Sequence, residues 1–172
     1  MIKKIKSIMK LVYFRLLGPN KVAKKLGVKM GKNCVLRSVY FGSEPYLIEM
    51  GDNVQTTRGV TFITHDSLSV FRIKYPEYKN SDLFGKITIG NNVFIGINAI
   101  ILRGTTIGDN VIIGAGSVVK GEIKSNSVYA GVPAKFICTL DEYIEKNRDS
   151  FVNTKHLNQN DKKNFLLKKY NL

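Results

Sequence analysis

The sequence predicts an all-β solenoid, in which the chain winds into stacked coils made of short strands. Three observations predict it. An aliphatic residue recurs every six positions, a Gly-x-Asn corner returns after three such repeats, and helical spacing occurs only near the two termini. A helix repeats every 3.6 residues and a half-buried strand every two. A six-residue period therefore indicates short strands joined by tight corners.

The period is clearest from residue 89 onward, in the run IGNNVFIGINAIILRGTTIGDNVIIGAGSVVKGEIK. An aliphatic residue opens each hexad, and we expect it to point into the solenoid: Ile89, Ile95, Ile101, Ile107, Ile113 and Val119. A second small or apolar residue follows four positions later in each: Val93, Ala99, Thr105, Val111, Ser117 and Ile123. The regularity indicates one inward aliphatic side chain per strand.

The corners are marked by the motif Gly-x-Asn, which occurs at residues 31–33, 51–53, 90–92 and 108–110. Gly and Asn tolerate the positive φ that a sharp corner needs. Gly108 follows Gly90 after three complete hexads, which predicts a triangular coil and places the next corner at Asn126. Gly51 follows Gly31 after three hexads and two extra residues, and the extra residues fall in FGSEPYL.

The stretch from Gly51 to Gly90 is longer than one coil, and its length equals either two coils plus three residues or one coil plus a 21-residue insertion. Regular hexads run up to Phe62 and then stop, which favours the second count. We therefore predict a single inserted loop over residues 66–86. Loops of this length without regular structure are usually functional or disordered. This one is rich in aromatic residues, and we expect it to pack against something: Phe71, Tyr75, Tyr78 and Phe84.

The two open ends of a solenoid need caps, and the termini supply candidates. We predict an N-terminal amphipathic helical segment over residues 1–27, the β-helix over 28–137 and a C-terminal helical extension over 138–172. Residues 2–16 place apolar side chains at helical spacing among lysines. Two interpretations stay open: a helix that packs on the coil, or a basic amphipathic helix that contacts an anionic membrane.

Composition limits the class of protein. A length of 172 residues suits one domain, and 27 Lys and Arg against 13 Asp and Glu give a net charge of +14. This charge favours anionic partners, but no nucleic-acid recognition motif accompanies it. The two cysteines form no metal motif, and no apolar run approaches the roughly 20 residues of a membrane span. The sequence thus favours a cytoplasmic protein, with the inner face of the membrane kept open by the basic segment.

Taken together, the hexads, the stretch FITHD, the stretch IGAGS and the closing AGVPAK resemble the hexapeptide-repeat acyltransferases. The resemblance covers about residues 28 to 140 and is strongest to the sugar and polysaccharide O-acetyltransferases of that family. It implies a left-handed parallel β-helix and a homotrimer with sites between neighbouring subunits. It also implies acetyl transfer from acetyl-CoA to a hydroxyl group.

His65 ends the last regular hexad before the loop and matches the family's catalytic histidine. A sugar hydroxyl needs a base to attack a thioester at neutral pH, and an imidazole titrates near that pH. Asp66 is a second candidate, although neighbouring strand residues point to opposite faces, so it is expected to shape the loop or reach another chain. Ser67 is not expected to be a nucleophile, because the family transfers the acetyl group directly.

The resemblance implies a cofactor-binding set that lies in or beside the hexad corners: Ile97, Asn98, Ala115, Gly116, Val119, Lys120, Gly131, Pro133 and Lys135. Backbone N–H groups around Ile97 and Asn98 would bind the thioester oxygen, and Lys135 would meet a CoA phosphate. Equally, the glycines could simply form corners and Lys135 could be a solvated surface residue. Arg103 departs from the proline that many relatives carry at its position.

The sequence-based prediction is therefore an acetyl-CoA-dependent O-acetyltransferase without a metal. Its acceptor is a sugar, a nucleotide-sugar or a lipid-linked glycan. An amino-sugar N-acetyltransferase is the main alternative, and a non-catalytic β-helix binding module is a weaker one. A carbonic anhydrase of the same fold needs three histidines around zinc, whereas this chain has only His65 and His156.

Overall fold

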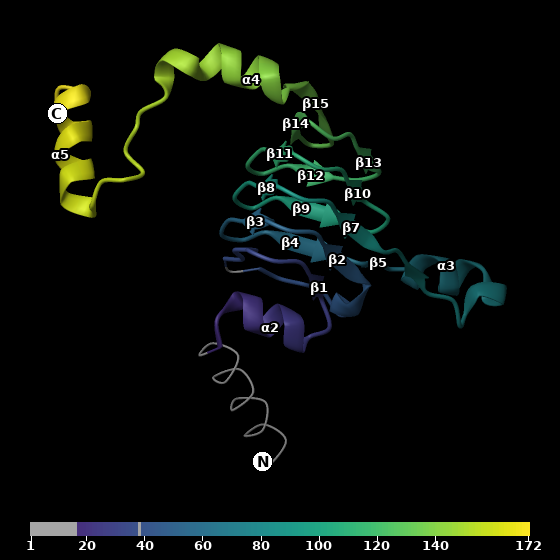
Figure 1. The fold of residues 1–172 in the computed structure, drawn as a ribbon. Helices are drawn as coiled ribbons and strands as arrows, with labels where there is room; N and C mark the ends of the chain where they lie inside the picture. Colours follow the sequence, from purple (N-terminus) through teal and green to yellow (C-terminus); the bar gives the residue numbers. More distant parts are fainter. Residues whose placement is uncertain (1–16, 38) are drawn as a thin grey trace. The chain divides into compact units, whose positions relative to one another are not determined.

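The protein divides into two compact units in a computed structural model that describes residues 17–37 and 39–172. The first unit ends at Asp141, and the second runs from Glu142 to Leu172. The first unit is a stack of β-coils, shown edge-on in Figure 1. The expected helix over residues 2–16 lies outside the described residues.

Three sheets form the sides of the stack. Sheet A contains β1 (Lys29–Met30), β2 (Ile48–Met50), β7 (Ile87–Ile89), β10 (Thr106–Ile107) and β13 (Glu122–Ile123). Sheet B contains β3 (Gln55–Thr56), β8 (Val93–Ile95), β11 (Val111–Ile113), β14 (Ser127–Gly131) and β15 (Ala134–Thr139). Sheet C contains β4 (Thr61–Ile63), β9 (Ile100–Leu102) and β12 (Val118–Val119). The chain visits A, B and C in turn, so each coil has three sides, as predicted.

The strand register confirms the coil lengths expected from the corners. Ile89 pairs with Ile107, and Val93 pairs with Val111, in each case three hexads further along the chain. Met50 pairs with Ile89, across the long stretch that contains the loop. These two residues therefore belong to consecutive coils, and the count of one coil plus an inserted loop is confirmed.

Both predicted sets of inward residues fill the interior. Every one of the twelve is at most 3% exposed. Two of them are hydroxyl residues whose hydrogen bonds are made locally. Thr105 Oγ1 donates to the Leu102 carbonyl at 2.6 Å, and Ser117 Oγ donates to the Gly114 carbonyl at 2.7 Å. The interior thus holds polar side chains without leaving a buried donor unpaired.

The Gly-x-Asn corners depend on their two residues for different reasons. The four asparagines adopt φ of 55–57°, and so does Asn126. Asn126 lies at the next corner, as predicted, but it stands in the asparagine position of that corner, 16 residues after Asn110, because the last coil is two residues shorter than three hexads. Gly90 is not among the positive-φ residues; a Cβ placed there would lie 2.8 Å from the carbonyl oxygen of Gly108 in the next coil. The glycine is therefore needed for the close approach of two coils, and only the asparagine for the turn.

Side-chain amides also connect successive corners. Asn53 donates to Asn92, Asn92 to Asn110 and Asn110 to Asn126, at 2.8, 2.9 and 2.9 Å. This ladder runs along the solenoid at the corner between sheets A and B. It ties each coil to the next outside the backbone pairing.

The described part of the chain closes both ends of the stack. At the first coil, helix α2 (Pro19–Lys25) buries Ala23 in the core. Its Asn20 side chain donates to the Cys34 carbonyl at 2.5 Å and accepts from the Leu36 amide at 2.9 Å. At the other end, β15 pairs antiparallel with β14. These contacts satisfy backbone groups that would otherwise be unpaired at an open solenoid end.

The inserted loop leaves the coil after Thr64 and returns at Gly85, whose amide donates to the Thr64 carbonyl at 2.9 Å. It contains β5 (His65–Asp66), α3 (Ser69–Lys74), η2 (Pro76–Tyr78) and β6 (Leu83–Phe84), with β5 and β6 antiparallel. Figure 1 shows α3 projecting from the side of the stack. Its aromatic rings pack on one another, Phe71 on Tyr75 and Tyr75 on Tyr78. All three remain 37–51% exposed.

The chain becomes helical after β15. Helix α4 (Leu140–Asn147) spans the boundary between the two units, and η3 (Arg148–Ser150) and α5 (Gln159–Lys169) follow. The strand β15 extends to Thr139, so helical structure starts two residues after the predicted position 138. Across residues 17–37 and 39–172, no helix combines the length and apolar character needed to cross a bilayer.

Candidate active site

The three corners of each coil are stacked into three long edges of the solenoid. Each edge is named after the two sheets that it joins: AB, BC and CA. The AB edge carries the asparagine ladder. The BC edge carries the turns at residues 58–59, 97–98, 115–116 and 131. The CA edge carries the segment 42–47, the inserted loop and the turns at 103–104 and 120–121. A three-residue strand spans roughly 10 Å, so that distance separates neighbouring edges.

His65 lies on the CA edge and forms a hydrogen bond with Glu44. Its Nδ1 is 2.9 Å from Glu44 Oε2, which also accepts from Thr64 Oγ1 at 2.9 Å. Glu44 precedes the short helix η1 (Pro45–Leu47) in the corner one coil earlier. The carboxylate side chain is 15% exposed and the imidazole 40% exposed. Glu44 thus fixes a histidine ring that still reaches solvent.

The electrostatics of the pair define the tautomer of His65. Desolvation raises the pKa of Glu44, but the hydrogen bonds from Thr64 and His65 lower it by more, so the net pKa lies below the ordinary 4.5. The carboxylate is therefore ionised at neutral pH and can only accept hydrogen bonds. A neutral imidazole at this position must then carry its proton on Nδ1, which leaves the lone pair on Nε2. That nitrogen is the one available as a base.

Asp66, the second catalytic candidate, pairs with another residue. Its Oδ2 accepts from Arg103 Nε at 2.5 Å, in the next coil on the same CA edge. The alternation along β5 keeps the Asp66 carboxylate away from the His65 ring, as expected for neighbouring strand residues. The ring of Phe84, the cross-strand partner of His65, lies edge-on to the imidazole with centroids 6.3 Å apart. Asp66 and Phe84 therefore hold the start of the loop.

Most of the predicted cofactor residues gather on the BC edge. The Ile97 carbonyl accepts from the Gly116 amide at 2.7 Å, and the Gly131 amide donates to Ser117 Oγ at 3.2 Å. This stacks three turns into one column: Ile97 and Asn98, then Ala115 and Gly116, then Gly131. Ala115, Gly116 and Gly131 are exposed. They leave a narrow strip of accessible backbone.

The amide of Asn98 is already used between coils, because it donates to the Arg58 carbonyl in the preceding coil at 3.0 Å. Among the described residues, the Ile97 amide donates to no backbone or side-chain acceptor. Of the two candidate donors for a thioester oxygen, the geometry therefore favours Ile97.

The remaining cofactor candidates lie elsewhere. The Val119 side chain is fully buried, so it could contact a ligand only through its backbone. Lys120 is exposed on the CA edge, two coils beyond the loop of His65. Pro133 and Lys135 are exposed in the hairpin that joins β14 to β15.

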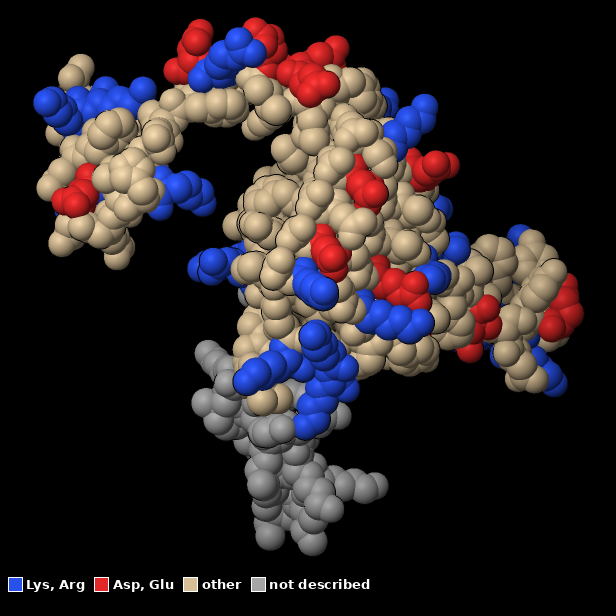
Figure 2. Space-filling model, in the orientation of Figure 1, with Lys and Arg blue, Asp and Glu red and all other residues tan. Residues whose placement is uncertain are grey.

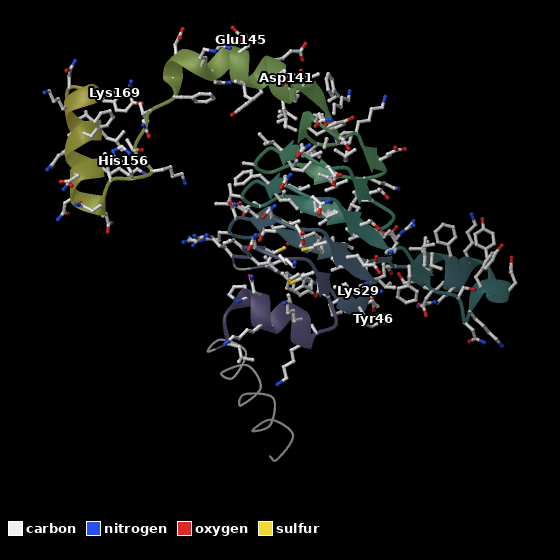
Figure 3. All side chains as sticks on the ribbon, viewed as in Figure 1. Lys29, Tyr46, Asp141, Glu145, His156 and Lys169 are labelled. Atoms are coloured by element: carbon white, nitrogen blue, oxygen red, sulfur yellow. The ribbon has the colours of Figure 1, made fainter. Side chains whose placement is uncertain are left out.

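The stacked turns at 97–98, 115–116 and 131 are called the cofactor column. His65 and the cofactor column lie on different edges of one chain, with sheet C between them. His156 belongs to the segment between η3 and α5 in the second unit (Figure 3). Within the part of the chain that the structure describes, no three His, Cys, Asp or Glu side chains gather as metal ligands would.

Glu44 is the candidate site residue that sequence reasoning missed. A signal was present, because the coil from Gly31 to Gly51 is two residues longer than the three-hexad repeat. The extra residues fall in the same corner, one coil earlier, as the break at His65. Two interruptions at one edge indicate side chains that can meet.

Comparison with known proteins identifies the repeat. The family described as bacterial transferase hexapeptide, six repeats, matches residues 86–121. The chain is 50% identical over 151 residues to Protein CapG of Staphylococcus aureus, covering 86% of each protein. Among solved structures, a maltose O-acetyltransferase from Clostridium difficile 630 is 26% identical with a TM-score of 0.58, covering 80% of this chain and 87% of that one. A galactoside acetyltransferase in complex with coenzyme A is 29% identical with a TM-score of 0.54, covering 80% and 74%.

Proposed function

This chain belongs to the bacterial hexapeptide-repeat transferases and is an acyltransferase, and we propose that it moves acetyl from acetyl-CoA to a hydroxyl of a sugar or surface-polysaccharide precursor. The observation that carries the proposal is the 2.9 Å contact between His65 Nδ1 and Glu44 Oε2. It supports an oriented base on a solvent-facing edge. The left-handed sense of the coil and a cytoplasmic location are part of the same proposal.

In this mechanism the acceptor hydroxyl donates its proton to His65 Nε2 as its oxygen attacks the acetyl carbonyl. The tetrahedral intermediate then collapses, the bond between the carbonyl carbon and the CoA sulfur breaks, and the imidazolium returns the proton to the departing sulfur, which gives the acetyl ester and free CoA. The imidazolium that forms is stabilised by the Glu44 carboxylate at Nδ1, as in other carboxylate–histidine pairs. A base within hydrogen-bond reach of the attacking group typically contributes 10²- to 10⁴-fold in rate. The Ile97 amide would donate to the oxygen that becomes negative.

Acetyl-CoA supplies the activated acetyl group as a thioester. The exposed backbone of Ala115, Gly116 and Gly131 fits an extended arm, because little side-chain bulk projects from that strip. Lys120 and Lys135 are exposed cations suited to phosphate groups. Pro133 and Val119 would then contribute shape and backbone, since neither side chain carries a polar group.

The separation of the two edges supports a homotrimer. His65 on the CA edge and the cofactor column on the BC edge are separated by sheet C, roughly 10 Å wide, within one chain. A second subunit that brings its BC edge against the CA edge of the first would join the base to the thioester. The site would then lie between subunits.

The test of the reaction is acceptor-dependent release of free CoA thiol from acetyl-CoA. The panel contains neutral sugars, amino sugars, nucleotide-sugars and lipid-linked glycans, so it also separates hydroxyl from amine acceptors. We expect His65→Ala to lose roughly 10²- to 10⁴-fold in kcat while it still binds acetyl-CoA. The matched control is His156→Ala, which should keep full activity. An unchanged rate in His65→Ala would exclude His65 as the base.

The test of the shared site is subunit mixing. Ala115→Trp obstructs the cofactor strip and His65→Ala removes the base, so each variant alone should be inactive. When the two are co-expressed, some interfaces pair an intact His65 with an intact strip, and activity should return. Mixed assemblies without any activity would place the whole site within one chain.

A further inference from the structure

A basic pocket lies at the end of the solenoid that carries α2, on the AB edge. It has a volume of about 510 Å³. Its polar lining comes from the helix and from the first two Gly-x-Asn corners: Asn20, Lys21, Lys24, Lys32, Asn33 and Asp52. The AB edge holds neither His65 nor the cofactor column. This pocket is therefore separate from the proposed active site.

The positive charge in the pocket exceeds the negative charge among the described residues. Three lysines face one carboxylate, and Asp52 already accepts from the Lys32 amide through Oδ1 at 2.7 Å. Lys21, Lys24 and Lys32 are exposed, and none of them forms an ion pair with a described residue. Elsewhere on sheet A, by contrast, Lys29 and Lys86 share Glu49 at 2.7 and 2.5 Å. Figure 2 shows lysine and arginine side chains gathered over the α2 end of the stack.

The first corner also differs from the later ones in its hydrogen bonds. In later coils the asparagine amides form the ladder from Asn53 to Asn126. Asn33 adopts the same corner conformation, with φ of 55°, yet its exposed side chain bonds to no described residue. Asn33 does not continue the ladder by donating to Asn53, so its side-chain amide, like the Lys32 ammonium group, is left as a donor toward solvent. The pocket thus combines three cations with a free amide donor.

We propose that this pocket binds a phosphate group. Lysine binds phosphate as a compact charge with three donors, and an amide N–H adds a directed hydrogen bond. Its volume far exceeds the roughly 30 Å³ share of a liquid water, which leaves room for a diphosphate or a lipid headgroup. The phosphate can therefore come from a soluble ligand or from an anionic lipid, and both sources share the same recognition chemistry.

The experiment compares two triple variants of the full chain. Lys21→Glu/Lys24→Glu/Lys32→Glu reverses the charge of the pocket. Lys162→Glu/Lys163→Glu/Lys168→Glu makes the same change on α5. Each lowers the net charge by six, from +14 to +8, so a difference between them reports position and not overall charge. Circular dichroism and the thiol-release assay verify that both variants fold and react.

Two probes distinguish a soluble phosphate ligand from an anionic lipid headgroup. Calorimetric titration with inorganic pyrophosphate measures the soluble ligand, and co-sedimentation with phosphatidylcholine vesicles, with and without phosphatidylglycerol, measures the lipid surface. Each lysine near an anionic surface contributes roughly a factor of five, and the three glutamates add repulsion, so the pocket variant should bind phosphatidylglycerol vesicles at least about 100-fold more weakly. Pyrophosphate binding should weaken by at least about tenfold.

A loss confined to the pocket variant supports the site, and the probe that reports it identifies the source. The proposal fails if wild type binds neither probe. It also fails if both triple variants lose binding equally, because net charge alone would then account for the interaction.

Discussion

Residues 87–110 of the solenoid, its regular half, keep the three-hexad rule, whereas the coils before them, its interrupted half, deviate from it. From Ile87 to Asn110 the chain repeats after every third hexad without interruption. The inward-facing residues of these hexads are all buried. Before Ile87 the coils are interrupted twice, by two extra residues near Glu44 and by the loop that starts at His65. Both interruptions fall on the CA edge, in consecutive coils.

The difference teaches where chemistry can be placed in a solenoid. A regular coil pairs every strand with the coils above and below, so its residues are committed to packing. An interruption at a corner releases a segment without breaking the sheets, because the chain rejoins the coil at Gly85 through the Thr64 carbonyl. The regular half is therefore expected to carry stability and the interrupted half the base.

The largest loss of stability is expected from a substitution in the regular half. Ile101→Ala removes a side chain that is fully buried between β4 and β12. Truncating a buried isoleucine to alanine leaves a cavity and typically lowers the free energy of unfolding by about 2–5 kcal/mol, which denaturant titration would measure. Ile73→Ala in the inserted loop is the control. That side chain is 85% exposed, so the change should stay within about 0.5 kcal/mol. Equal losses in the two variants would contradict the division between the halves.

The next effect concerns catalysis in the interrupted half. Glu44→Ala removes the group that orients His65, and we expect kcat to fall on the order of 10- to 100-fold, the usual cost of losing a carboxylate that orients a functional histidine. Glu44→Gln keeps a carbonyl acceptor for the Nδ1–H and should lose less. Glu49→Gln, a glutamate paired with lysines on sheet A, is the matched control and should leave kcat unchanged. If Glu44→Ala were fully active, its contact with His65 would be only structural.

A smaller effect is expected where the two halves are joined. The Asp66–Arg103 pair connects the start of the loop to a turn of the regular half. Exposed pairs contribute about 0.2–1 kcal/mol, so Arg103→Ala should loosen the loop without unfolding the coil. Hydrogen exchange should report faster opening of residues 67–83 and unchanged protection of β9 and β11. Asp66→Asn combined with Arg103→Ala should add little to either single change. Additive effects would show that the two side chains act independently.

The smallest effect is a pH dependence of stability on sheet A. Hydrogen bonds from Lys29 and Lys86 lower the pKa of Glu49 from 4.5 to about 2. Because the pKa of Glu49 is lower in the folded state, its ionised form stabilises that state. This stabilisation is fully present when the pH lies above 4.5, the pKa in the unfolded chain, and it is lost as the pH falls toward 2. Unfolding titrations should show wild type losing its advantage over Glu49→Gln across that interval. High salt should reduce the difference, because the group is exposed to solvent. A difference independent of pH would contradict the lowered pKa.

The sequence by itself determined the repeat architecture. Positions such as Ile101 and Val111 could be assigned to the interior because the interior of a solenoid is periodic. The same pattern of buried and exposed positions is repeated in each hexad. The inserted loop followed from counting in units of three hexads, whereas the corner at Asn126 comes two residues earlier than that count, 16 residues after Asn110. His65 was found for the same reason, because a break is visible only against a regular background.

The tertiary structure decided what the period does not encode. Glu44 and His65 are 21 positions apart, and they meet because stacking superimposes two corners of unequal length. The role of Gly90 is likewise a matter of contact with Gly108 in the next coil and not of its own φ. The separation of His65 from the cofactor column depends on which edge each turn joins. Such facts arise between coils, whereas the sequence pattern describes one coil at a time.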